Sequence, residues 1–140
     1  MAHLHHAIPG WVKTGATFHL RLRFAPIPTS ELPASAGRLL AAARTYHNLR
    51  RWHLQLVVIM PDHLHALMAF PPDRPMSTVV GSWKRYVARE HGVSWQSNYF
   101  DHRIRHEHEL RETWDYLRNN PVAKGLCPTP DAWPWQWQWQ

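Results

Sequence analysis

Cysteine is nearly absent from this 140-residue chain, which contains only Cys127. A single cysteine excludes an intrachain disulfide and a cysteine-based zinc framework, so a hydrophobic core has to hold the fold together. Long apolar runs are also missing, since the longest, from Leu56 to Met60, falls far short of the roughly 20 residues that a transmembrane helix needs. The residues before Ala7 contain no apolar stretch of signal-peptide length. These absences predict a cytoplasmic protein that does not act at a membrane.

Acidic residues are scarce as well, with 10 aspartates and glutamates against 16 lysines and arginines. The formal net charge is +6 before any of the 12 histidines is protonated. This excess favours a polyanionic partner, and nucleic acid fits better than a membrane surface because no basic amphipathic anchor is present. A basic composition without functional meaning is the alternative.

The length and the hydrophobic content of 44% suit one globular domain over residues 1–140 and argue against disorder. Within this domain we expect residues 1–12 to be flexible and residues 128–140 to form a Trp-rich tail. The terminal Trp-Gln alternation, from Trp135 to Gln140, is predicted to be an apolar flap or a frayed end.

Apolar and polar residues alternate from Thr17 to Phe24, which predicts a half-buried strand with a basic outer face. A helix capped by Ser35 and running toward Leu49 follows. Two further strands, 52–60 and 63–70, meet at the tight connection Pro61-Asp62 and form a hairpin. The remaining predicted elements are a helix from Ser77 to His91-Gly92, a strand over 95–105 and a helix over 107–119 that Pro121 ends.

The resulting element order, βαββαβ followed by a helix, is that of the ferredoxin-like split βαβ arrangement. It predicts an α+β fold with a four-stranded antiparallel sheet and two helices on one face of it. The last helix is an addition to this unit, and it carries Tyr116.

Two histidines, His63 and His65, follow the tight turn at the start of a predicted strand. Their i, i+2 spacing sends both imidazoles to the same face of the strand, about 6–7 Å apart along it. Two neutral imidazoles aimed at one point form half of a metal site. The spacing alone is a weak signal, because two other histidine pairs in the chain share it. Histidines at the edge of the core that bond to the backbone are the alternative.

The predicted last helix supplies a second pair, since Tyr116 and Asn120 are spaced i, i+4 and share one face. A core aromatic and a helix C-cap are the alternative for these residues. If this face packs against His63 and His65, two imidazoles and an amide oxygen can hold Mg²⁺ or Mn²⁺ with open positions for phosphate oxygens. The phenol then lies beside a polarised phosphodiester. Its attack leaves a covalent phosphotyrosine, which is strand-transfer chemistry.

Four blocks of the sequence resemble one protein family. Residues 60–65, Met-Pro-Asp-His-Leu-His, resemble the HUH motif (His, bulky apolar, His) of the single-tyrosine transposases, which are insertion-sequence 200-like. Residues 95–105 and 116–126 are similar to later blocks of the REP-associated tyrosine transposase branch, and residues 131–135, Asp-Ala-Trp-Pro-Trp, look like its Trp-rich ending. The resemblance spans nearly the whole chain in the same order and spacing. It departs after Trp135, where the family usually continues with serines and this chain has Gln-Trp-Gln-Trp-Gln.

This resemblance implies a ferredoxin-like domain that cuts and rejoins single-stranded DNA, often near the hairpins of repetitive extragenic palindromes (REP elements). It implies Tyr116 as the nucleophile, giving a 5′-phosphotyrosine and a free 3′-OH. It also implies His63, His65 and Asn120 as ligands of Mg²⁺ or Mn²⁺. The protein would then be a bacterial transposase or a domesticated relative, cytoplasmic and nucleoid-associated when bound to DNA. Related proteins are monomers or homodimers.

Basic and aromatic residues suit a DNA path on this scaffold. The residues predicted to contact DNA are Lys84, Arg85, Arg89, Trp95, Arg103 and Arg105. For each of them a solvated charge or a core aromatic is the alternative. Two other functions stay open for the chain: a non-catalytic nucleic-acid-binding module on the same ferredoxin-like scaffold, and a hydrolase that uses a metal-bound water.

Overall fold

The computed structural model describes residues 9–12 and 16–139 of the chain. Of the segment that the sequence predicts to be flexible, residues 1–8 lie outside the described residues, and Val12 is buried. The elements are, in chain order, β1 Thr17–Phe24, α1 Leu32–Asn48, β2 His53–Ile59, β3 His63–Ala69, α2 Met76–His91, β4 Trp95–Ile104, α3 Glu107–Ala123, a short 3₁₀ helix Pro130–Ala132 and β5 Gln136–Gln138.

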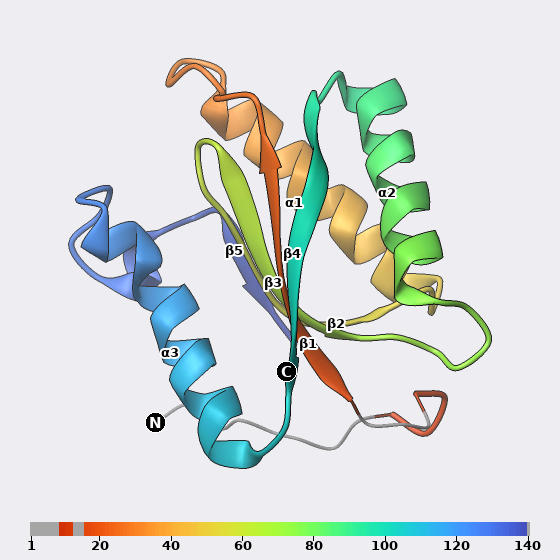
Figure 1. The fold of residues 1–140 in the computed structure, drawn as a ribbon. Helices are drawn as coiled ribbons and strands as arrows, with labels where there is room; N and C mark the ends of the chain where they lie inside the picture. Colours follow the sequence, from red (N-terminus) through yellow and green to blue (C-terminus); the bar gives the residue numbers. More distant parts are fainter. Residues whose placement is uncertain (1–8, 13–15, 140) are drawn as a thin grey trace.

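The five strands form one antiparallel sheet in the order β4-β1-β3-β2-β5. Its first four strands have the order of the ferredoxin-like arrangement, so the predicted α+β fold class is confirmed. Figure 1 shows α1 and α2 together on one side of the sheet and α3 on the opposite side. None of the helices in the described residues is long and apolar enough to span a bilayer.

The fifth strand corrects the prediction of a four-stranded sheet that is followed by a flap or a frayed end. Residues Gln136–Gln138 pair antiparallel with β2. The pairing extends on both sides, because Ile59 N–H donates to the Trp135 carbonyl (2.8 Å) and Trp139 N–H donates to the Gln55 carbonyl (2.9 Å). The Trp-Gln alternation has the period of a strand, and without β5 the outer backbone groups of β2 would be unpaired. The end of the chain is therefore an edge strand.

The alternation of side chains along β3 divides them between two cores. Leu64, Ala66 and Met68 enter the larger core, which α1 and α2 cover. The smaller core lies under α3 and consists of Leu56, Val58, Met60, Leu67, Ile104, Trp114, Leu117 and Trp133. His63 and His65 alternate with the residues of the larger core, so they lie on the side of the sheet that carries α3.

The last helix does not end where the sequence predicts, because α3 continues through Pro121. Proline removes one helix hydrogen bond, and so close to the C-terminus that loss is tolerated. The helix ends instead in a Schellman motif at Gly125, whose φ is +74°. There Gly125 N–H donates to the Val122 carbonyl (2.9 Å) and Leu126 N–H donates to the Pro121 carbonyl (2.8 Å). Asn120 is therefore an internal residue of α3 rather than its C-cap.

His53, at the start of β2, is fully buried, and neither of its ring nitrogens has a hydrogen-bond partner among the described residues. Burial, together with the nearby His47, lowers the pKa of His53 from 6.5 to about 4. Between these two values the unfolded chain binds a proton that the folded chain does not, so stability falls as the pH falls through this window. Lowering the pH from 7 to 5 should reduce the free energy of unfolding of the wild type by about 2 kcal/mol more than that of His53→Leu.

The measurement is urea unfolding of both proteins at the two pH values. His108→Leu is the matched control, since the His108 side chain is 75% exposed on α3 and its removal should leave the wild-type pH dependence nearly unchanged. An identical pH dependence in wild type and His53→Leu would show that the buried imidazole does not resist protonation.

Candidate active site

The two histidines of the hairpin lie close together on the α3 side of the sheet. The ring centroids of His63 and His65 are 4.8 Å apart and their planes are perpendicular. His65 is only 4% exposed, whereas His63 is half-buried. Leu64 between them enters the opposite core. The pair thus has one ring inside the fold and one at its surface, as a site open to a substrate requires.

Each of the two imidazoles is held through its Nδ1 atom. His63 Nδ1 lies 2.7 Å from Oδ1 of Asp62, and His65 Nδ1 lies 3.0 Å from Nε2 of His19 on β1. With a proton on Nδ1 of His63 and on Nδ1 of His65, both hydrogen bonds form. The Nε2 atoms of these two rings then keep lone pairs that can bind a metal. Contacts of this kind fix the tautomer and the ring orientation of metal-binding histidines.

The residues around Asp62, His65 and His19 keep these three side chains in the charge states that the two hydrogen bonds require. The hydrogen bond with His63 is the main cause that lowers the pKa of Asp62, so the acceptor is a carboxylate. Burial, together with the nearby His63, His19 and Arg21, lowers the pKa of His65 to about 2. Burial, with Arg21 and His102, also lowers the pKa of His19 to about 4. His19 and His65 are therefore neutral near pH 7, and the neutral imidazole is the form that binds a metal.

Tyr116 and Asn120 lie on α3, one helical turn apart. The Tyr116 side chain is 64% exposed, and its ring centroid is 6.4 Å from that of His65. Asn120 is 6% exposed and belongs to the buried face of α3, together with Trp114 and Leu117. Packing of this face on the smaller core holds α3 over the sheet, so the tyrosine reaches the histidine pair from a separate element.

The donor set suits a divalent ion. The described residues contain no group of three or more histidine, cysteine, aspartate or glutamate side chains that is placed to hold a metal. A metal at His63 and His65 therefore needs a further ligand of another type, and the amide oxygen of Asn120 on the helix above them is of that type. Two imidazoles and one amide oxygen leave coordination positions of a divalent ion open for oxygen atoms of a substrate.

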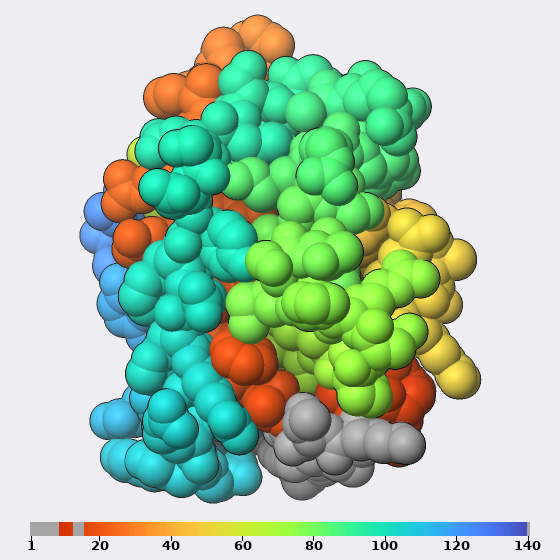
Figure 2. Space-filling model, turned by 45° about the vertical axis from the view of Figure 1, so that its right-hand side comes forward, coloured from red at the N-terminus to blue at the C-terminus, as the bar shows by residue number. Residues whose placement is uncertain are grey.

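Most of the residues predicted to contact DNA lie on the α2 side of the sheet, away from Tyr116. Lys84 Nζ lies 5.8 Å above the ring of Trp95, and together with Arg85 these residues line an open groove between α2 and β4. Figure 2 views the side of the molecule on which α2 and β4 adjoin. Arg103 lines a second groove beside Phe18 and Phe70, two residues packed with the larger core.

The other two predicted DNA contacts lie apart from these grooves. Arg89 is exposed near the end of α2 and pairs with the adjacent Glu90. Arg105 follows β4, and its backbone N–H donates to Glu109. The six residues therefore do not form one surface with the histidine pair, and their contacts with DNA stay predictions.

Three residues that the sequence analysis does not single out lie beside the histidine pair. Arg21 of β1 is opposite His65 in one neighbouring strand and opposite Phe100 in the other. Its guanidinium lies 5.2 Å above the Phe100 ring, and the ring of His19 lies 5.3 Å from that of Phe100. The basic outer face of β1 is the sequence signal for His19 and Arg21, whereas Phe100 has none beyond its place in a predicted strand. Their proximity to His65 depends on the strand register, which the sequence does not reveal.

The fold and this site define an α+β protein in which a histidine pair on a central strand faces an exposed tyrosine on a separate helix. The structure of the REP-associated tyrosine transposase bound to a REP hairpin has a similar fold, with a TM-score of 0.75 and 22% sequence identity. The similarity covers 97% of this chain and 81% of that protein.

Sequence comparison leads to the same family name. The chain is 28% identical over 96 residues to a Haemophilus influenzae protein named "Putative REP-associated tyrosine transposase", a match that covers 56% of this chain and 54% of the relative. An uncharacterized H. influenzae protein is 28% identical over 94 residues, which cover 46% and 52% of the two chains. The chain thus spans about half the length of these curated relatives, and no protein-family model matches it. The resemblance to REP-associated tyrosine transposases that the motifs indicate is confirmed.

Proposed function

We propose that the chain cleaves and rejoins single-stranded DNA beside a hairpin through a covalent 5′-phosphotyrosine at Tyr116. The proposal depends on one observation, the distance of 6.4 Å between the ring of Tyr116 and that of the buried His65. A tyrosine that is 64% exposed contributes little to a core, whereas its hydroxyl can reach a phosphate bound at the histidines. The names of the relatives and the hairpin bound to the protein of similar fold support this activity and this substrate class.

The reaction proceeds by two exchanges of phosphate ester bonds. The Tyr116 oxygen loses its proton to solvent and attacks the phosphorus of the scissile phosphodiester. The bond from phosphorus to the 3′ oxygen breaks, and this oxygen takes up a proton and leaves as a free 3′-OH. The 5′-phosphotyrosine preserves the energy of the ester bond. Attack by a 3′-OH on the phosphotyrosine then seals a strand and releases the phenol.

Residues around Tyr116 position the reacting phosphate. In this proposal His63, His65 and Asn120 hold Mg²⁺ or Mn²⁺, which supplies Lewis-acid polarisation of the phosphate when bound. Asp62 and His19 fix the tautomers of the two imidazoles through their Nδ1 contacts. The buried position of His65 keeps its ring orientation constant, so that the phosphate and the phenol meet in one geometry.

The test is incubation of the protein with end-labelled hairpin DNA that has a single-stranded flank, in the presence of Mg²⁺ or Mn²⁺. We expect a protein–DNA adduct that survives denaturing electrophoresis and retains a 3′-end label, together with release of the 5′-labelled fragment. Mass spectrometry of the digested adduct should locate the DNA on Tyr116. Cleavage without an adduct would instead indicate attack by water. Binding without cleavage would indicate a non-catalytic module, and either result contradicts the proposal.

A prediction for His19 follows from its contact with His65. We expect His19→Ala to weaken Mn²⁺ binding by roughly 10- to 100-fold, because the Nδ1–H of His65 loses its acceptor and the ring is free to rotate. His19→Gln should restore part of the affinity, since its amide oxygen can accept the same hydrogen bond. Isothermal titration calorimetry measures these affinities without any DNA.

His102→Ala is the control for His19→Ala. His102 lies opposite His19 on β4, but it bonds to Glu109 rather than to His65. Its removal should leave Mn²⁺ affinity near the wild-type value. Equal affinities of wild type and His19→Ala would show that the contact does not position a metal ligand.

A further inference from the structure

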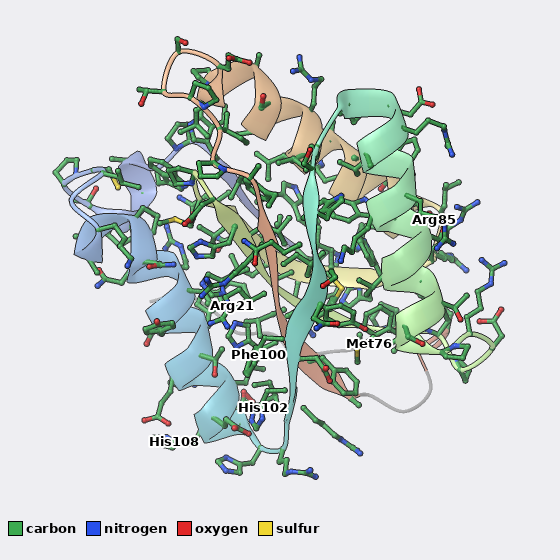
Figure 3. All side chains as sticks on the ribbon, turned by 45° about the horizontal axis from the view of Figure 1, so that its top comes forward. Arg21, Met76, Arg85, Phe100, His102 and His108 are labelled. Atoms are coloured by element: carbon green, nitrogen blue, oxygen red, sulfur yellow. The ribbon has the colours of Figure 1, made fainter. Side chains whose placement is uncertain are left out.

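Phe100 is an exposed aromatic residue on the edge strand β4. Its side chain is 42% exposed, although its neighbour on the same face of the strand, Ile104, is buried under α3. The Arg21 guanidinium lies 5.2 Å above the Phe100 ring, and Figure 3 shows the two side chains together between β4 and α3. A planar apolar surface of this kind, with a cation attached, is the pattern on which proteins stack unpaired bases.

The positive charge of Arg21 is not neutralised by a carboxylate among the described residues. Its Nε atom is buried without a hydrogen-bond partner, and no ion pair involves Arg21 among the described residues. The carboxylates of Asp62 and Glu109 bond instead to His63 and His102. Because no carboxylate pairs with it, this guanidinium is available to bind an anion from outside the chain.

The Phe100–Arg21 pair is continuous with the candidate active site. Ring centroids lie 5.3 Å apart for Phe100 and His19, 5.1 Å for His19 and His65, and 6.4 Å for His65 and Tyr116. A line of four rings therefore connects the edge of the sheet with the tyrosine. Each of these three steps is of the same order as the separation of neighbouring nucleotides in an extended single strand, so a strand can follow this line with a few nucleotides between its two ends.

We propose that Phe100 and Arg21 form a subsite for one unpaired nucleotide of the single-stranded DNA, a few nucleotides along the strand from the phosphate that Tyr116 attacks. The base stacks on the exposed side of the Phe100 ring, and Arg21 binds a backbone phosphate. This inference rests on the proposed function, since it names the place where the flank of the same DNA substrate binds. It differs from the predicted DNA path along α2, whose basic residues lie on the other side of the sheet.

The test is binding of hairpin DNA with a single-stranded flank, measured by fluorescence anisotropy without added metal. We expect Phe100→Ala to weaken binding by roughly 5- to 100-fold, the range for the loss of one base stack, and Phe100→Trp to retain the affinity. Arg21→Ala should reduce the slope of log Kd against log salt concentration by about 1, whereas Arg21→Lys should keep it. A fluorescent 2-aminopurine in the flank should be quenched by wild type and not by Phe100→Ala.

Two controls separate this subsite from general effects. Leu49→Ala removes another exposed apolar side chain (56% exposed), and Arg38→Ala removes an exposed charge on α1, where no DNA contact is predicted. Because a Phe100→Ala protein could lose stability, Phe100→Leu serves as a second variant that keeps apolar contacts with Arg21 but lacks a ring. Wild-type binding and quenching by a folded Phe100→Leu protein would overturn the inference.

The outcome of this test is independent of the proposed chemistry. If Phe100→Leu and Arg21→Ala bind and quench like the wild type while wild-type protein still forms the adduct, the subsite is wrong and the phosphotyrosine activity stands. If wild type forms no adduct and the variants nevertheless lose binding and quenching, the subsite stands and the catalytic proposal fails.

Discussion

A Tyr116→Phe protein is expected to bind hairpin DNA as tightly as the wild type and to form no covalent adduct with it. The substitution removes only the phenolic oxygen, which is the proposed nucleophile, and it leaves the ring near His65 in place. We expect cleavage to fall by at least about 10³-fold, as is usual when a nucleophile is removed. The side chain is 64% exposed, so the free energy of unfolding should change by less than about 0.5 kcal/mol. Denaturing electrophoresis and anisotropy measure the two quantities.

The matched control for this experiment is Tyr99→Phe. Tyr99 is a half-buried tyrosine of β4 that contacts Lys84 on the α2 side of the sheet, so its hydroxyl has no proposed role in catalysis. This variant should form the adduct at the wild-type rate. An adduct that persists in Tyr116→Phe would mean that another side chain is the nucleophile. Cleavage that persists without an adduct would favour a metal-bound water.

The elements of this fold with a strong local pattern lie where the sequence predicts them. β1 spans Thr17–Phe24 as its alternation indicates, and β3 begins at His63 directly after the turn. Gly92, with a φ of +69°, ends α2 as expected. The start of α1 was predicted wrongly, because the helix begins at Leu32 and Ser35 lies inside it rather than at its cap. Pro33 occupies the first turn, a position that proline tolerates well. Local periodicity therefore determines the kind of element better than its ends.

The candidate site combines local and non-local information. The i, i+2 spacing of His63 and His65 places them on one face, and this follows from the period of a strand alone. The contact of His65 with His19 joins residues 46 positions apart and requires the register of β1 against β3. The same register brings Arg21 beside His65. Residues that support a site from neighbouring strands have no signature in a single sequence, because any alternating strand presents candidates at every second position.

The position of α3 could be predicted only through a resemblance to known proteins. The spacing of Tyr116 and Asn120 fixes their common helix face but not the element on which this face packs. The structure shows that the helix is held on the smaller core partly by Trp133, which comes from the segment after it. The sequence predicts a tail for that segment, because an alternation over so few residues does not reveal a strand with which it could pair. Its role in the fold depends on the pairing of β5 with β2.

A Trp133→Ala protein is therefore expected to lose about 3–5 kcal/mol of unfolding free energy, a large part of the stability of a domain of this size. Trp133 is 6% exposed, and its indole Nε1–H donates to the Ile59 carbonyl (3.0 Å). The truncation leaves a cavity between β2 and α3 and an unpaired carbonyl at the end of β2. Urea unfolding at pH 7 measures the change in stability.

Trp133→Ala should also affect Tyr116 indirectly. Trp133 packs with Trp114 and Leu117, which flank Tyr116 on α3, so the cavity lies directly beneath the helix that carries the nucleophile. We expect faster amide hydrogen exchange in α3 and slower adduct formation in the protein that remains folded, with exchange in α2 nearly unchanged. Trp137→Ala is the matched control, because Trp137 is half-buried on the other core and should cost less stability and leave α3 protected. Equal effects of the two substitutions would mean that the segment after α3 stabilises the sheet alone and does not hold the tyrosine in place.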